Sequence, residues 1–274
     1  MNEFESGKFS YYEKSHLFHG SLKNIMGTRF DIVIVGKDKI QSESVWYTIE
    51  SELKRLNNLL NRFDKLSETS RINSKAASVS VIVTDEMWHI LNSCKYYHQH
   101  TLGLFDITLK DFDSVKFSEY DKSITFAHPG IQIDFGGYGK GYALNKIKSI
   151  LVESKIDCSY VDFGNSSILG LGHHPYGDDW KVTIENPYNK DQIIDELSLR
   201  DTALSISGNT PTYSGHIVAP KSGQSISEPR MVSVISDNPL EAEVLSTALM
   251  IANEQEKKQI KENFNILNIK EYKL

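Results

Sequence analysis

The sequence predicts an α+β fold: a single compact domain with mixed strands and packed helices. Helix-like and strand-like segments follow one another irregularly, without the repeated strand–helix–strand order of a doubly wound sheet. Of the 274 residues, 39% are hydrophobic and 24% are charged, an ordinary globular composition with enough apolar mass for a large core. No stretch rich in proline, glycine, serine or charge marks a linker, and no internal repeat divides the chain.

The first half of the chain is expected to contain an early strand and two long helices. Residues 28–35 alternate in character and are rich in β-branched side chains, which predicts a strand. Residues 41–63 carry apolar side chains at three- and four-residue steps from Val45 to Leu60, which is typical of a helix buried along one face. Residues 85–101 are predicted to form the second helix.

The second half is expected to contain short strands and further helices. The strand-like segments are residues 115–117, 123–126, 132–134, 159–163, 180–185, 196–199, 203–205, 231–235 and 265–269. A helix is predicted to begin after Gly137 and to run to about Glu153. Another opens at Asn238-Pro239, because proline is favoured in the first turn of a helix, and a short helix precedes the last strand.

Charge and hydropathy disfavour two classes of partner. The formal net charge is −6 with both signs interspersed, so no binding to DNA or RNA is expected. No stretch approaches the roughly 18 apolar residues of a transmembrane segment, and residues 1–20 lack the pattern of a secretory leader. As the sequence is given, a cytoplasmic location is expected, although a chain trimmed of a leader would look the same.

The two cysteines, Cys94 and Cys158, stand far apart and in no metal-binding or redox spacing. They are expected to be buried, reduced thiols, and nothing in the pattern demands a disulfide.

Residues 134–141, Asp-Phe-Gly-Gly-Tyr-Gly-Lys-Gly, join a strand end, adjacent glycines, a lysine and a helix start. Glycines let backbone N–H groups approach a phosphate, while the helix N-terminus and Lys140 add positive charge, so the segment is suited to binding an anion. The spacing fits neither a P-loop nor a dinucleotide-binding fingerprint. On this pattern alone, a tight turn before a helix is an equally good interpretation.

Other motifs accompany this segment in a fixed order. They are Met26-Gly27-Thr28, Ser67-Glu68-Thr69-Ser70-Arg71-Ile72-Asn73, Gly103-Leu104-Phe105-Asp106-Ile107-Thr108, Ser207-Gly208, His216-Ile217-Val218-Ala219-Pro220-Lys221-Ser222-Gly223, and Glu243 with Thr247. Each is weak alone, but the ordered set, over roughly residues 25 to 252, resembles the FAD:protein FMN transferase (ApbE-type) family. By this resemblance, the chain would be a somewhat divergent member of that family.

The resemblance implies an ApbE-like flavin transferase domain over residues 25–274, preceded by an N-terminal extension over residues 1–24. It also implies a magnesium-dependent enzyme that moves FMN from FAD to a threonine or serine of a target flavoprotein and releases AMP. FAD is then the donor substrate, Mg²⁺ the cofactor and the target flavoprotein the partner.

The family's functional residues carry over to matching positions. The FAD site would be lined by Met26, Phe63, Leu104, Phe105, Asp106, Asp134, Lys140 and Ile217. The carbonyl of Gly137, with Glu243 and Thr247, would hold the metal, because an all-oxygen set suits Mg²⁺ and the last two share a helix face. His216 is the candidate general base, since the ordinary pKa of histidine lies near working pH.

Plainer interpretations of these residues stand beside the functional ones. If the resemblance is set aside, Met26 and Phe63 are interpreted as core residues. Glu243 and Thr247 are then interpreted as part of a solvated helix face. His216 would be structural, and Asp106 with Thr108 would stabilise a turn or cap a helix.

The sequence departs from the family pattern at several places. Glu243 stands where aspartate is usual, Ala219 replaces an acid, Asn165-Ser166 follows Gly164 in place of a second glycine and an amide or acid, and residues 108–134 are shortened. Two alternatives therefore stay open beside transfer: hydrolysis of the FAD pyrophosphate to FMN and AMP, and flavin binding by a non-catalytic paralogue.

Overall fold

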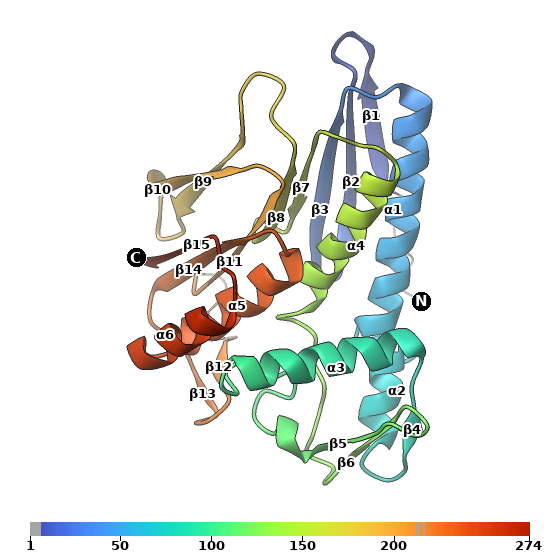
Figure 1. The fold of residues 1–274 in the computed structure, drawn as a ribbon, viewed down its shortest axis with the longest axis vertical. Helices are drawn as coiled ribbons and strands as arrows, with labels where there is room; N and C mark the ends of the chain where they lie inside the picture. The colour runs from blue at the N-terminus through green and yellow to red at the C-terminus, as the bar shows by residue number, and fades with distance from the viewer. Residues whose placement is uncertain (1–6, 212–213, 216) are drawn as a thin grey trace.

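The computed structural model describes residues 7–211, 214–215 and 217–274. Its centre is an eight-stranded antiparallel sheet with the strand order β1-β2-β3-β7-β8-β11-β14-β15 (Figure 1). The strands are β1 (Lys8–Tyr12), β2 (Leu17–Ile25), β3 (Thr28–Val35), β7 (Ser159–Phe163), β8 (Ser167–Leu171), β11 (Thr202–Gly208), β14 (Arg230–Ser236) and β15 (Asn268–Lys273). Their order mixes early and late segments of the chain, so the sheet is built only when both halves meet.

Three helices cover one face of this sheet (Figure 1). They are α1 (Lys39–Leu60), α4 (Gly139–Glu153) and α5 (Pro239–Ile251). The apolar faces of α1 and α4 bury their side chains together with those of β2 and β3, and α5 packs against β11 and β14. A shorter helix, α6 (Glu254–Asn263), follows α5 and leads into β15.

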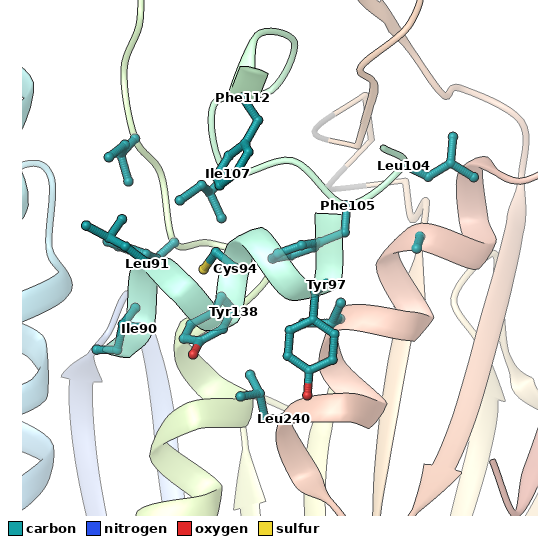
Figure 2. Close-up of a cluster of buried hydrophobic side chains, with 14 of the residues drawn as sticks. Ile90, Leu91, Cys94, Tyr97, Leu104, Phe105, Ile107, Phe112, Tyr138 and Leu240 are labelled. Atoms are coloured by element: carbon teal, nitrogen blue, oxygen red, sulfur yellow. The ribbon is translucent and has the colours of Figure 1, made fainter. Parts of the chain in front are cut away.

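A second group of elements lies beyond one end of the large sheet, next to α5 (Figure 1). It comprises α2 (Glu68–Lys75), α3 (Asp85–His100) and a small sheet of β4 (Val81–Ile82), β6 (Ser123–Phe126) and β5 (Val115–Ser118). Figure 2 shows the buried cluster that ties this group to the rest, with side chains from α3, the loop after it, Tyr138 and Leu240. The core is therefore continuous across the junction, as a single α+β domain requires.

The remaining described elements are two hairpins and two 3₁₀ turns. One hairpin pairs β9 (Trp180–Asn186) with β10 (Asn189–Leu199), and a smaller one pairs β12 (Val218–Ala219) with β13 (Gln224–Ser225). The 3₁₀ turns are η1 (Glu13–Ser15) and η2 (Phe112–Ser114). None of the helices in the described ranges is long and apolar enough to cross a membrane.

Most predicted elements are confirmed, including the strands at residues 28–35 and 159–163 and the helices at 85–101 and after Gly137. The first long helix ends at Leu60 rather than Phe63, and the last strand starts three residues late, at Asn268. The two cysteines are free thiols, Cys94 buried and Cys158 half-buried.

The predicted strand at residues 132–134 is wrong. Its backbone groups pair with a side chain: Ile133 N donates to Asn73 Oδ1 at 2.7 Å, and Asn73 Nδ2 donates to Ile133 O at 2.9 Å. Because one asparagine satisfies both groups of Ile133, the segment is held in place without a neighbouring strand.

Residues 8–12 and 17–25, which fall almost entirely in the predicted N-terminal extension, form β1 and β2 of the large sheet. The division of the chain at residue 25 stays a prediction. Also unpredicted were α2, β4 and β8.

At Gly141, α4 lies close against α5, and this close contact predicts a loss of stability when a side chain is added there. A Cβ at this position would lie 2.6 Å from Glu243 Cβ and 2.9 Å from both Leu240 Cα and Pro239 O. We expect Gly141→Ala to lower the free energy of unfolding by about 1–3 kcal/mol, since the helices would have to separate. Denaturant unfolding measures this change.

Gly177→Ala is the matched control, because the nearest atom to its Cβ would be 3.9 Å away in an exposed loop. Its unfolding midpoint should stay at the wild-type value. Equal stability of the Gly141 and Gly177 variants would contradict the tight contact between α4 and α5.

Candidate active site

The candidate site is built on the turn that leads into α4. Gly139 N and Tyr138 N both donate to Phe135 O, at 2.8 and 3.0 Å, and Gly136 N donates to Asp134 Oδ1 at 2.8 Å. Asp134 N donates in turn to Ile107 O at 2.7 Å, which fixes the turn against the loop after α3. The turn therefore ends at a helix N-terminus, whose dipole favours an anion.

Tyr138, at the start of α4, is a core residue. Its side chain is fully buried among the aromatic rings of the cluster in Figure 2. Burial raises the pKa of its phenol far above the ordinary value, because the phenolate would have no water around it. Tyr138 thus anchors the turn and is not available as an acid or base.

Asp134 faces the loop between α1 and α2. Its Oδ2 lies 3.2 Å from Arg62 Nε, and the Arg62 guanidinium carbon lies 4.7 Å from the centre of the Phe63 ring. Phe63 is 80% exposed, so it is no core residue and its ring is open to a ligand. The plainer interpretation of Phe63 is therefore wrong, while its role at FAD stays a prediction.

The Leu104–Asp106 segment follows α3 and is held by the burial of its side chains and by hydrogen bonds to Asp106. Leu104 and Phe105 are buried in the cluster of Figure 2, and Asp106 is 9% exposed. The Asp106 carboxylate accepts hydrogen bonds from Thr108 N and Oγ1, both at 2.7 Å, and from Phe112 N at 3.3 Å. Through these bonds Asp106 stabilises the turn of its own loop, as expected from the plainer interpretation of Asp106 and Thr108.

Met26 directly follows β2 and contacts the turn at Gly139. Its backbone is left-handed (φ 47°), and its N–H donates to Asn57 Oδ1 on α1 at 3.1 Å. A Cβ on Gly139 would lie 2.8 Å from the Met26 methyl carbon, so the two residues are in contact. Met26 is half-buried at the first residue of α4.

Lys140 and Glu243 form the charged pair of the site. Lys140 Nζ donates to Glu243 Oε1, and the glutamate is 4% exposed. The other oxygen, Oε2, accepts from Ser167 Oγ on β8 at 2.5 Å and from Ser205 Oγ on β11 at 3.0 Å. Glu243 is therefore buried against the sheet, which contradicts its interpretation as part of a solvated helix face.

Thr247 stands one turn after Glu243 on α5 and next to Gly137. A Cβ on Gly137 would lie 3.3 Å from Thr247 Oγ1, so the absence of a side chain keeps that hydroxyl uncovered on this side. Thr247 Oγ1 lies 3.3 Å from the Glu243 carbonyl oxygen and 3.3 Å from Ser207 Oγ. The Gly137 backbone and the Thr247 hydroxyl are thus neighbours.

The described residues hold no group of three or more His, Cys, Asp or Glu side chains arranged for a metal ion. A metal here would need a mixed set of oxygens: the Gly137 carbonyl, the Thr247 hydroxyl and Oε1 of Glu243. These donors suit Mg²⁺ in kind, and Gly137 leaves room beside Thr247, so the residues fit the ion. Lys140 competes for the same oxygen of Glu243.

The structure thus brings Gly137 next to Thr247 and Phe105, and Lys140 next to Glu243. Asp134 and Phe63 both meet Arg62, and Met26 contacts Gly139. Ile217 is buried in the same core cluster as Leu104 and Phe105. His216, the expected base, lies outside the described residues.

Sequence reasoning missed Arg62, Ser167 and Ser205. Arg62 directly precedes Phe63, and that adjacency is a signal that could have been used. The serines belong to different strands, β8 and β11, and their contact with Glu243 depends on sheet register, which the sequence does not display.

Comparison with known proteins gives the family. A sequence model of the ApbE family matches residues 26–115 and 110–268, and the chain belongs to that family. It is 21% identical over 276 residues to the FAD:protein FMN transferase of Klebsiella pneumoniae (strain 342), with 86% of this chain and 79% of that protein covered. It is 25% identical to the protein of that name in Chlamydia pneumoniae, with 88% and 87% covered.

Solved structures agree on the fold. The flavin transferase ApbE from Vibrio cholerae superposes with a TM-score of 0.80 at 20% identity, covering 94% of this chain and 97% of that one. The ApbE protein of Thermotoga maritima gives a TM-score of 0.76 at 20% identity, covering 87% and 88%. The α+β architecture predicted from the sequence is therefore that of the ApbE proteins.

The loop around Asp106 predicts a local stability effect. Asp106→Ala leaves the Thr108 and Phe112 donors without their acceptor, and we expect it to lower the free energy of unfolding by about 1–3 kcal/mol. Denaturant unfolding measures the loss, with Asp113→Ala as control, since the Asp113 side chain is 98% exposed. A control that loses as much stability as Asp106→Ala would show that the bonds to Asp106 are not what holds the loop.

Proposed function

We propose that this chain is a magnesium-dependent FAD:protein FMN transferase, which moves FMN from FAD to a threonine or serine of a target flavoprotein. Two relatives covered over most of their length carry the name FAD:protein FMN transferase. The observation that carries the proposal is the meeting of a glycine-rich helix start, Lys140 and the Glu243–Thr247 turn of α5. Such a site suits a pyrophosphate rather than a neutral ligand.

The reaction breaks the phosphorus–oxygen bond to AMP and forms a phosphoester between FMN and the acceptor hydroxyl. Lys140 and the N–H groups at the start of α4 would bind the negative pyrophosphate and hold it against the developing charge. The acceptor proton must go to a base, for which His216 is our proposal. AMP leaves with the oxygen of the broken bond.

Mg²⁺, when bound, would offset the charge of the pyrophosphate and of the departing AMP. Gly137, Glu243 and Thr247 are the residues proposed to hold it, through a carbonyl, a carboxylate and a hydroxyl. All three are held by the junction of α4 and α5, so the ion's position would be set by the packing of these helices.

The flavin-binding part of the proposal uses the surroundings of the turn. The residues proposed to line the FAD site are Met26, Phe63, Leu104, Phe105, Asp106, Asp134, Lys140 and Ile217. Leu104, Phe105 and Ile217 have buried side chains, so their backbones would face the ligand, whereas the exposed ring of Phe63 can stack on it. Asp134 is already paired with Arg62, which would therefore lie at the same ligand.

Intact mass spectrometry tests the proposal directly. The protein is incubated with FAD, Mg²⁺ and a target flavoprotein domain, and AMP is measured in the same sample. We expect AMP to appear together with the mass of one FMN on the target, and neither to appear in EDTA. AMP without a modified target would mean hydrolysis, and flavin binding without AMP would mean a non-catalytic paralogue.

Removal of the Glu243 carboxylate tests the metal part. We expect Glu243→Ala to reduce Mg²⁺-dependent AMP release to background, because the proposed ligand set loses its carboxylate and Lys140 loses its partner. The matched control is Glu254→Ala on α6, whose side chain is 90% exposed, and it should keep wild-type activity. Unchanged AMP release by Glu243→Ala would reject this metal site.

A further inference from the structure

Glu243 is held by an unusual set of hydroxyl groups. Ser167 Oγ and Ser205 Oγ both meet its Oε2, and Ser205 Oγ lies 3.0 Å from Ser246 Oγ. Ser246 Oγ lies 2.8 Å from Ser207 Oγ, which lies 3.3 Å from Thr247 Oγ1. A hydrogen-bonded chain of hydroxyls therefore runs from the buried carboxylate to the hydroxyl beside Gly137.

The two oxygens of the carboxylate have different surroundings. Oε2 points at β8 and β11 and, within the described part of the chain, accepts from the Ser167 and Ser205 hydroxyls, while Oε1 meets Lys140, whose side chain is 20% exposed. Ser167 and Ser205 are themselves buried, so no water replaces their hydroxyls when one is removed. A buried carboxylate without such donors would be strongly destabilised.

We propose that Ser167 and Ser205 are positioning residues: they fix Oε2 of Glu243 so that Oε1 is presented to Lys140 and to the ligand that Lys140 binds. This inference rests on the proposed function for the identity of that ligand, an FAD pyrophosphate. The glutamate side chain reaches the two serines with Oε2 and still leaves Oε1 at Lys140.

The Glu243 carbonyl also gives Thr247 an orientation. Each hydroxyl has a single proton, and the proton of Ser205 is directed at the negative carboxylate. Ser246 Oγ donates to the Glu243 carbonyl oxygen at 3.0 Å, and Thr247 Oγ1 donates to the same oxygen at 3.3 Å. The Thr247 oxygen thereby keeps its lone pairs for a positive ligand on the side of Gly137.

The test measures Lys140 itself and needs neither flavin nor turnover. Acetylation of Lys140 by acetic anhydride at one fixed pH is followed by peptide mass spectrometry in wild type, Ser167→Ala, Ser205→Ala and the double variant. If the serines hold the glutamate on Lys140, labelling should rise about tenfold in the double variant, the factor expected for a lost hydrogen bond to a charge.

Glu243→Gln supplies the coupling measurement. This single substitution should raise the labelling of Lys140. Adding both serine substitutions to Glu243→Gln should change labelling by no more than about twofold further, because the serines act through the carboxylate. Ser205→Thr retains the hydroxyl and should restore wild-type labelling. Ser233→Ala, at a buried serine of β14 that pairs with Tyr272, is the control for removing a buried hydroxyl and should leave labelling unchanged.

The inference is overturned if the folded serine variants label Lys140 at the wild-type level while Glu243→Gln labels it more strongly. A serine effect of equal size in the Glu243→Gln background overturns it as well. If the double variant does not fold, the two single variants decide, each with about half the effect on a logarithmic scale. Absence of AMP release by wild type would end the proposed function, yet the labelling result would still judge the role of the serines.

Discussion

The structure depends on the contact between the start of α4 and the first turns of α5. Gly141 lets the two helices approach until Glu243 lies against α4, and Lys140 neutralises the carboxylate that this approach buries. A charge this deep is stable only with such partners, so the ion pair, the serine hydroxyls and the glycine form one arrangement. The glycine-rich turn, Thr247 and the core cluster of Figure 2 are placed by the same contact.

This contact also explains why the site lies between distant segments of the chain. Residues 134–141 come from the middle of the sequence, α5 from its last part, and Met26 and Phe63 from its first part. The strand order of the large sheet places β3, β7, β8 and β11 side by side, which brings these segments to the same end of α4. A site assembled in this way is buried where the helices meet at Glu243 and exposed where Phe63 projects.

Much of the fold could be predicted from local pattern, because burial on one face leaves a periodic trace. Residues 28–35 show the alternation of a half-buried strand, and α1 shows the spacing of a half-buried helix. β2 was not predicted because Gly20 occupies a position where the alternation of a strand calls for an apolar side chain. The Trp46 ring fills that space: a Cβ on Gly20 would lie 2.5 Å from the nearest ring atom of Trp46. The partners of Glu243 were missed because they come from β8 and β11, and no local pattern reports contact between strands.

The most direct measurement is a crystal structure of the protein with FAD and Mg²⁺ in place. The account predicts electron density for the pyrophosphate over Gly136–Lys140 and for an ion that touches Gly137 O, Thr247 Oγ1 and Glu243 Oε1, with Ser167 and Ser205 still on Oε2. Flavin bound elsewhere, or an ion that touches none of these three oxygens, would contradict it.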